Sequence, residues 1–453
     1  MTVSASLIEH AFLSILALYA ALECALAIMQ TRAAERAVGR VPEGFENKVS
    51  LAAFRKAADY TGDITQANLL LALLGALFAL AMTMGGGLVV LTGFFETLFG
   101  PGVIAQWCVI VTVLALMTAV ELPFGWWARF RVRERYGYMR EARSEWLVKT
   151  VLETTAGCLI VLPLTAFALT VFEYAGERWW FLAWIVWTLR LFWRWQITRV
   201  EGIFWHRRAR PYENETVRGR TKAYLREHGI IMTDMIVMTR PVSWDHANVV
   251  LAGWGRKRCV VVFAHAAALL SEDELLAAIA HETGHLKHGH ALLRIVLFSA
   301  IGFACCRFAG WAATADAFFD GIGFSPMLTS QMPGTHAGWV VAVIIVTFPV
   351  IMYPLAPFVN LFSRLLQYDA DRFAARTVGT GVMISALVRL HRDYSMTLTP
   401  SRLYSLFHYR RPHVGMRVAA LRHYGPRGPL DVQAAETPSA DTEAAPTDKT
   451  SAA

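Results

Sequence analysis

The chain has 453 residues, of which 55% are hydrophobic and only 17% are charged, and its mean hydropathy is +0.39. These values argue against a soluble protein and favour an integral membrane protein. The net charge of +8 does not indicate nucleic-acid binding, because the basic residues flank apolar segments instead of forming one patch.

Long apolar segments predict a mainly α, polytopic protein of about seven transmembrane helices, since about 20 helical residues cross a bilayer. The segments lie near 6–30, 66–91, 103–124, 150–173, 179–198, 291–314 and 337–359. Two ionisable residues within them, Glu23 and Arg190, are expected to face the bundle interior, because exposure of either to lipid is costly.

The placement of charge predicts the topology. Arginine and lysine crowd 31–65 and 125–149, whereas 92–102 and 315–336 contain neither. Basic loops stay cytoplasmic, so the N-terminus is expected outside and the C-terminus inside. The segment 199–290 then lies in the cytoplasm, and the Ala- and Arg-rich composition favours a bacterial inner membrane.

The segment 199–290 has the pattern of a soluble insert. A helix is expected over 218–228, and short strands over 235–239, 246–252 and 259–264, the last two joined by the turn Gly-Trp-Gly-Arg-Lys. We therefore expect the following divisions: five membrane helices in 1–198, a cytoplasmic α+β domain in 199–290, two membrane helices in 291–360, cytoplasmic helices in 361–424 and a disordered tail in 425–453.

The motif with the clearest chemistry is His-Glu-Thr-Gly-His, residues 281–285, which has the HExxH form of a zinc peptidase site. On a helix, His281 and His285 share a face and can bind one metal ion, while Glu282 is placed to take a proton from water that the metal activates. Ser271 and Glu274 form a capping box before an unbroken apolar run into the motif, which predicts the required helix.

Several motifs, in order along the chain, resemble those of the type I CAAX prenyl proteases and their bacterial relatives, which are integral-membrane zinc metallopeptidases. They are ELPFGWWARFRVRERYGYMR, HANVVLAG, HETGHLKHGH, NLFSRLLQYDADRFA and SLFHYRRPHVGMRVAAL, and with a segment after the first span they cover most of 35–421. The resemblance implies membrane helices that enclose a chamber, a zincin-type catalytic domain on the cytoplasmic side, and proteolysis of peptides or membrane proteins at the bilayer.

The resemblance also implies roles for individual residues. His281 and His285 match the two histidine ligands of one zinc ion per chain, and Glu282 matches the general base. His246 and Asn248 match the strand that holds an extended substrate. A further match, Asp371, would orient a ligand histidine, because ligating imidazoles usually donate their other N–H to a carboxylate or carbonyl.

Three positions depart from the family pattern. Gln367 stands where the third zinc ligand is a glutamate, and a neutral amide oxygen is a poorer ligand for zinc. Asp369, two residues on, is expected to face away from Gln367, so that it is no simple substitute. Arg411 replaces a histidine and is a candidate donor to developing oxyanion charge, and Met416 replaces a glutamate beside the retained Arg417.

Two functions follow from these observations. The first is a membrane-embedded zinc metalloendopeptidase with Glu282 as general base. The alternative is a weakened or inactive family member that acts as a membrane binding or scaffold protein, because Gln367, Arg411 and Met416 all depart from the pattern. The six cysteines are mostly within the apolar segments and suggest neither disulfides nor a cysteine zinc site.

Overall fold

The computed structural model describes residues 4–36, 39, 41–42, 45, 50–137, 142–204, 209–238, 248–324, 337–391, 397–426 and 428–431. The chain forms two compact units. The membrane unit comprises Met1–Ile197, Ala291–Arg364 and Asp393–His413, and the α/β unit comprises Thr198–His290, Leu365–Arg392 and Val414–Ala453.

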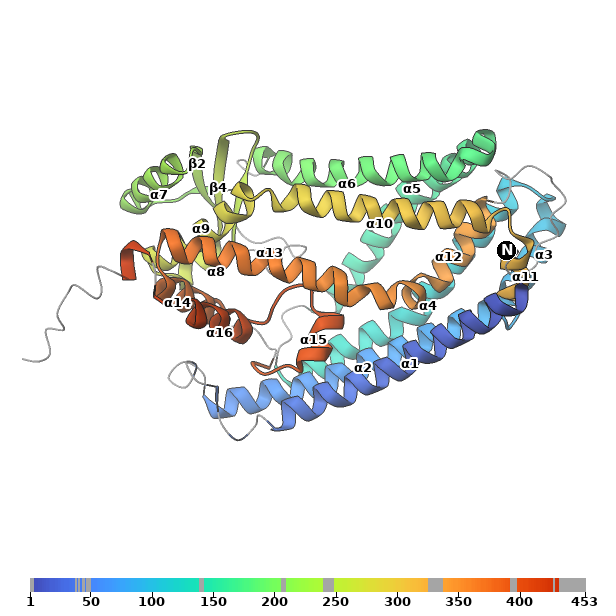
Figure 1. The fold of residues 1–453 in the computed structure, drawn as a ribbon, viewed down its shortest axis with the longest axis horizontal. Coiled ribbons are helices and arrows are strands. Elements are labelled where there is room, and N and C mark those ends of the chain that lie inside the picture. The colour runs from blue at the N-terminus through green and yellow to red at the C-terminus, as the bar shows by residue number, and fades with distance from the viewer. Residues whose placement is uncertain are drawn as a thin grey trace, which may run out of the picture. The chain divides into compact units, whose positions relative to one another are not determined.

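The membrane unit is built from helices (Figure 1). They are α1 (Ala5–Arg36), α2 (Leu51–Met82), α3 (Gly87–Phe99), α4 (Val103–Trp127), α5 (Arg143–Ala175), α6 (Trp179–Phe204), α10 (His290–Ala312), α11 (Asp316–Gly321), α12 (Ala337–Met352), the first part of α13 (Ala356–Thr377) and α15 (Arg402–His408). Short π or 3₁₀ segments adjoin them at Ala128–Arg133, Gly176–Arg178 and Tyr353–Leu355.

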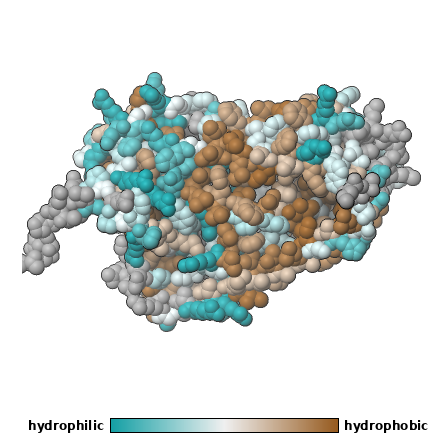
Figure 2. Space-filling view, viewed as in Figure 1, coloured by the Kyte–Doolittle hydropathy of each residue, from teal (hydrophilic) through white to brown (hydrophobic). Residues whose placement is uncertain are grey.

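Six helical stretches in the described part of the chain are long and apolar enough to cross a membrane: Ala5–Arg36, Leu51–Met82, Val103–Arg133, Arg143–Gln196, His290–Ala312 and Ala337–Thr377. The fourth stretch holds two of the predicted spans, α5 and α6, which a short turn at Gly176–Arg178 separates. The prediction of a mainly α, polytopic membrane protein is therefore confirmed. The surface over these helices is largely hydrophobic, whereas polar side chains dominate the surface of the α/β unit (Figure 2).

The predicted span at 66–91 is wrong in its boundaries. Helix α2 begins at Leu51, where Ser50 accepts a hydrogen bond from the backbone N–H of Ala53, and it ends at Met82. Three successive glycines at 85–87 mark the start of α3, and Gly86, directly before that helix, has a left-handed φ of 76°. Glycine adopts this conformation without the steric cost that other residues meet, so the triplet ends the helix within the apolar run.

The last part of the membrane unit, Asp393–His413, packs against its first two helices, α1 and α2. The backbone N–H of Thr397 donates to Thr61 Oγ1 at 3.1 Å, and that of Ser401 donates to Gln30 Oε1 at 2.8 Å. Glu23 is buried, as expected, and its carboxylate lies 3.6 Å from Nε2 of His408. Arg190 instead has an exposed side chain that lies over the ring of Trp187.

In its described residues, the α/β unit has four strands and five helices of its own, with the second part of α13. The elements are β1 (Arg210–Pro211), α7 (Glu215–Glu227), β2 (Ile231–Met238), β3 (Val249–Ala252), β4 (Lys257–Phe263), α8 (Ala264–Leu269), α9 (Glu272–Lys287), α14 (Thr380–His391) and α16 (Val414–Tyr424). The strand order is β1-β2-β4-β3, with β2 and β4 parallel and the outer pairs antiparallel.

Strand β4, one of the two inner strands of this sheet, is buried along Arg258–Phe263, which explains its apolar run Cys259–Phe263. The predicted hairpin of the last two strands is observed, with Val249 opposite Val262 and Ala252 opposite Cys259. Strand β3 is an edge strand in the described sheet. Near the C-terminus of the chain, Asp431 accepts hydrogen bonds from the backbone N–H groups of Thr380 and Gly381 in α14. The packed chain therefore extends beyond residue 425, where the disordered tail was expected to begin.

Candidate metal centre

Helix α9 carries the HExxH motif and begins with the predicted capping box. The backbone N–H of Glu274 donates to Ser271 Oγ, and the Glu274 carboxylate accepts from the Ser271 N–H at 2.8 Å. The same buried carboxylate accepts a hydrogen bond of 2.6 Å from Ser385 and lies 3.2 Å from Nε of Arg389, both on α14. One acidic side chain therefore caps α9 and attaches it to α14.

The glycine of the motif is explained by a helix crossing. A Cβ placed on Gly284 would lie 3.0 Å from Cβ of Phe373 and 3.2 Å from Cα of Ala370, both on α13. Real Cβ atoms rarely approach so closely, so any larger residue would push α9 away from α13. The absence of a side chain at Gly284 lets the histidines of α9 reach the polar residues of α13.

The first of these contacts joins His281 to Asp371. Nδ1 of His281 lies 2.8 Å from Oδ1 of Asp371, and both side chains are almost fully buried. Arg417 of α16 donates to both oxygens of the same carboxylate, at 2.7 Å from Nε to Oδ2. Burial alone would lower the pKa of Arg417, but the Asp371 carboxylate outweighs that effect and raises it, so the pair is ionised.

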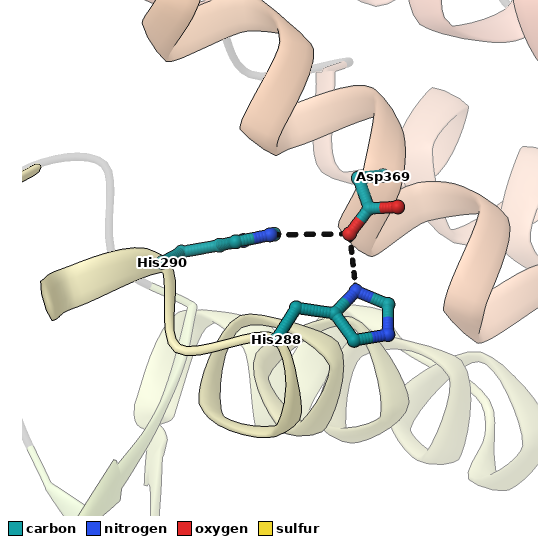
Figure 3. Close-up of side chains that lie close together, drawn as sticks. All are labelled: His288, His290 and Asp369. Carbon is teal, nitrogen blue, oxygen red and sulfur yellow. Dashed lines mark hydrogen bonds and ion pairs between the residues drawn. The ribbon is translucent and has the colours of Figure 1, made fainter. Parts of the chain in front are cut away.

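The second contact joins His285 to a chain of polar groups. Its Nδ1 lies 2.7 Å from Nδ1 of His290, and Nε2 of His290 lies 3.1 Å from Oδ2 of Asp369 on α13. The same oxygen of Asp369 is the partner of Nδ1 of His288 (Figure 3). Asp369 therefore receives two ring nitrogens that come from the end of α9 and the start of α10.

These partners determine which nitrogen of each ring carries a proton. A carboxylate only accepts hydrogen bonds, so His290 donates from Nε2 to Asp369. Nδ1 of His281 lies 2.8 Å from Oδ1 of Asp371 without the angle of a hydrogen bond, and the nearby carboxylate favours a proton on that Nδ1. The Nδ1 of a neutral His290 is then an acceptor, and His285 must donate to it from its own Nδ1. Both His281 and His285 consequently carry their lone pair on Nε2, the form in which an imidazole binds a metal ion.

The remaining predicted residues of the centre lie in the same unit. Glu282 follows His281 on α9, and its charge adds to that of Asp371 in stabilising the cation of Arg417. Gln367 is buried on α13, one helical turn before Asp371. Two imidazoles with their lone pairs on Nε2, with an amide oxygen from α13, are a donor set that suits zinc, although the amide is weaker than a carboxylate.

The sequence-based expectations for the other site residues have mixed outcomes. Asn248, directly before β3, is described, and its side-chain oxygen is buried without a hydrogen-bond partner among the described residues. Its neighbour His246 lies outside the described residues. Arg411 is exposed in a bend after α15 and belongs to the membrane unit.

Sequence reasoning missed the roles of two residues. Asp369 was expected only to face away from Gln367, and His288 was given no role, yet both belong to one cluster with His290. The spacing of two histidines around Gly289 was the available signal, because Gly289 takes a left-handed φ of 63° and turns the chain between α9 and α10. The partner on α13 could not be found in this way, since it lies 79 residues from His290.

Comparisons with known proteins identify the family of this chain. The family model described as "CAAX prenyl protease N-terminal, five membrane helices" matches residues 30–193, and that of peptidase family M48 matches residues 211–425. A CAAX prenyl protease 1 homolog of Dictyostelium discoideum is 24% identical over 297 residues, which cover 64% of this chain and 67% of the relative. CAAX prenyl protease 1 of Saccharomyces cerevisiae is 22% identical over 335 residues, with coverage of 69% and 71%.

A bacterial relative and a solved structure extend these findings. Protease HtpX of Acinetobacter baumannii is 29% identical over 148 residues, which cover 32% of this chain and 47% of the relative. The crystal structure of S. mikatae Ste24p shares the fold, with a TM-score of 0.73 at 18% identity and coverage of 93% of this chain and all of that one. The two family models together span most of the sequence, and the chain therefore belongs to peptidase family M48, a metalloprotease family, and to its CAAX prenyl protease branch.

Proposed function

We propose that this protein is a zinc-dependent endopeptidase that hydrolyses peptide bonds at a membrane, with Glu282 as the general base. The observation that carries the proposal is the pair of ring orientations on α9. Nδ1 of His281 lies 2.8 Å from the carboxylate of Asp371, and Nδ1 of His285 is hydrogen-bonded to His290, which leaves Nε2 of both rings for a metal ion. The carboxylate of the HExxH motif lies on the same helix, directly beside His281.

His281, His285 and the side-chain oxygen of Gln367 would hold one zinc ion. When bound, the ion would polarise the scissile carbonyl and lower the pKa of water. Glu282 takes the proton from the attacking water and passes it to the leaving amine, which contributes roughly 10²–10⁴ to the rate in comparable sites. Asp371 stabilises the orientation of His281, and Arg417 keeps that carboxylate ionised and fixed.

The substrate in this proposal is a peptide segment in extended conformation. Strand β3 is the edge of the described sheet and packs against α9, so a peptide could pair with its outer side and pass the metal residues. Asn248 stands at the start of this strand with an unsatisfied buried oxygen, which a substrate N–H would satisfy. His246 would extend the same recognition strand.

The setting follows from the helices and the charge distribution. The protein is an integral, multi-pass membrane protein, and we propose that its N-terminus lies outside and its catalytic α/β unit in the cytoplasm of a bacterium. The substrates would then be membrane proteins or membrane-attached peptides, as the CAAX prenyl protease name of several relatives suggests.

The test is metal content and peptide cleavage of the full chain in detergent. We expect wild type to contain tightly bound zinc and to cleave a library of fluorogenic peptides. Glu282→Gln should keep the zinc and lose roughly 10²–10⁴ in rate, whereas His281→Ala should lose both. Gln367→Glu should raise zinc affinity, because it restores a charged ligand.

Two results would contradict the proposal. A wild type without zinc or cleavage would mean that the chain binds peptides or membrane partners without catalysis. Cleavage that survives Glu282→Gln would show that another group takes the proton. If Gln367→Glu changes neither zinc affinity nor rate, Gln367 is not a ligand, and the metal is held without an oxygen from that position.

A further inference from the structure

The cluster of His288, His290 and Asp369 is separate in its donor atoms from the proposed catalytic centre. Nδ1 of His288 and Nε2 of His290 both point at one carboxylate oxygen, Oδ2 of Asp369 (Figure 3). The three ligand atoms all lie within 4.8 Å of one another. Two imidazoles and a carboxylate are a common ligand set for zinc and related divalent transition metals.

The local backbone brings these donors together. His288 caps the C-terminus of α9, and its N–H donates to the carbonyl of Gly284 at 3.0 Å. Gly289 then takes its left-handed conformation, which non-glycine residues adopt only at a cost, and His290 begins α10. Two histidines that are two residues apart are thereby presented to the same carboxylate of α13.

Burial gives the cluster one closed and one open side. The His290 side chain is 4% exposed, whereas those of His288 and Asp369 are 42% and 44% exposed. An ion could therefore enter from solvent, and water would complete its coordination. A merely structural contact needs only one histidine to pair with the aspartate, whereas three convergent donors with solvent access are what an ion requires.

We propose that His288, His290 and Asp369 form a second transition-metal site, and that an ion bound there opposes occupation of the catalytic site. The first part depends only on the cluster itself. The second part rests on the proposed function, because it requires that His285 bind a metal ion. The link is the single hydrogen bond between the Nδ1 atoms of His285 and His290.

The opposition follows from the one proton in that hydrogen bond. When His290 binds an ion through Nε2, its proton resides on Nδ1, so His290 becomes the donor and His285 the acceptor. The proton of a neutral His285 is then on Nε2, the nitrogen that the catalytic ion needs. No proton is gained or lost overall. The two sites therefore require opposite directions of the same hydrogen bond.

The site itself is tested with Co²⁺, whose visible absorption reports its ligands, added to the metal-stripped full chain in detergent. His281→Ala removes the catalytic site, and we expect this variant still to bind about one Co²⁺ per chain. Adding His288→Asn or Asp369→Asn to it should abolish that binding. Adding His423→Asn, the same change at an exposed histidine of α16, should leave it intact.

Failure of the site is distinct from failure of the proposed function. The second site is overturned if the His281→Ala variant binds no Co²⁺, or if His288→Asn does not reduce what it binds. If Co²⁺ binding passes this test while wild type neither contains tightly bound zinc nor cleaves peptides, the second site stands and the proposed function falls. Thermal unfolding of each variant without metal serves as the control for folding.

The opposition is tested by zinc inhibition of peptide cleavage, measured for each variant relative to its own rate at low zinc. Excess zinc should inhibit wild type and the His423→Asn control. In His288→Asn and Asp369→Asn, the inhibitory zinc concentration should rise by about tenfold or more, since a metal-binding group is lost. An inhibitory concentration unchanged by both substitutions would overturn the opposition.

Discussion

Gly284 of α9 and Phe373 of α13 meet so closely that a Cβ on the glycine would lie 3.0 Å from the Cβ of the phenylalanine. Gly284 lies between the two histidines of the HExxH motif, and His281 pairs with Asp371 of α13, whereas Asp369 of α13 pairs with His288 and His290. The spacing of two helices, and not only the identity of the side chains, therefore determines the geometry of the proposed metal centre.

Gly284→Ala should damage the centre through this contact. We expect a loss of about 1–3 kcal/mol in stability from overpacking and weaker zinc binding, because α9 must move away from α13. Gly219→Ala on α7 is the matched control, since nothing lies within 4 Å of its added Cβ. That change should stabilise the protein by up to about 1 kcal/mol. Thermal unfolding and zinc titration measure both effects, and equal behaviour of the two variants would contradict the argument.

Arg417 should act on the metal through Asp371 and His281. Arg417→Met leaves the buried carboxylate without its cation, so we expect zinc affinity to fall about 10–100-fold. Arg417→Lys should recover part of the loss, since a lysine supplies the charge without the two-pronged contact. Competition with a chelator measures the affinity. An effect no larger than that of Arg422→Met, at an exposed arginine of the same helix, would show that the contact is only structural.

Asn248 should affect substrate binding more than chemistry. Asn248→Ala removes one hydrogen-bonding group from the edge strand, which is worth about 1–3 kcal/mol in a buried setting. We expect a higher KM for extended peptides, a smaller change in kcat and unchanged zinc content. Steady-state kinetics with wild type as reference gives both constants. A loss confined to kcat would place Asn248 in the chemical step instead.

His408 should make the stability of the protein fall in acid. Its ring stacks on Tyr404, and burial lowers its pKa to about 4, even though the Glu23 carboxylate lies 3.6 Å away. The unfolded chain protonates near the ordinary value of about 6.5, so the unfolded state binds the proton more readily. The contribution of His408 is complete above about 6.5 and is lost as the pH falls towards 4.

The substitution His408→Gln removes this titration. Melting temperatures in detergent between pH 7 and pH 4 should therefore decline less steeply for the variant than for wild type. If the two curves stay parallel across this range, protonation of His408 does not destabilise the folded state.

Much of this protein is determined by its sequence alone. Apolar segments identified the membrane helices, and the capped run into His281 and His285 identified the helix that carries the HExxH motif, because both patterns depend on neighbours within a few turns. The helix break at Gly86 also has a local signal, three successive glycines. The apolar residues on both sides led instead to the prediction of one continuous span. Motif order was enough to indicate the family, which the family models confirm.

Only the tertiary structure decided which side chain contacts each histidine ring. Asp371 and Arg417 are 46 residues apart, and Asp369 is 81 residues from His288, so no local periodicity could pair them. From the helix alone, Asp369 is expected to point away from Gln367 and so not to replace it as a metal ligand. The crossing of α9 over α13 at Gly284 gives that direction a partner, because side chains that diverge on one helix can each meet a different part of its neighbour.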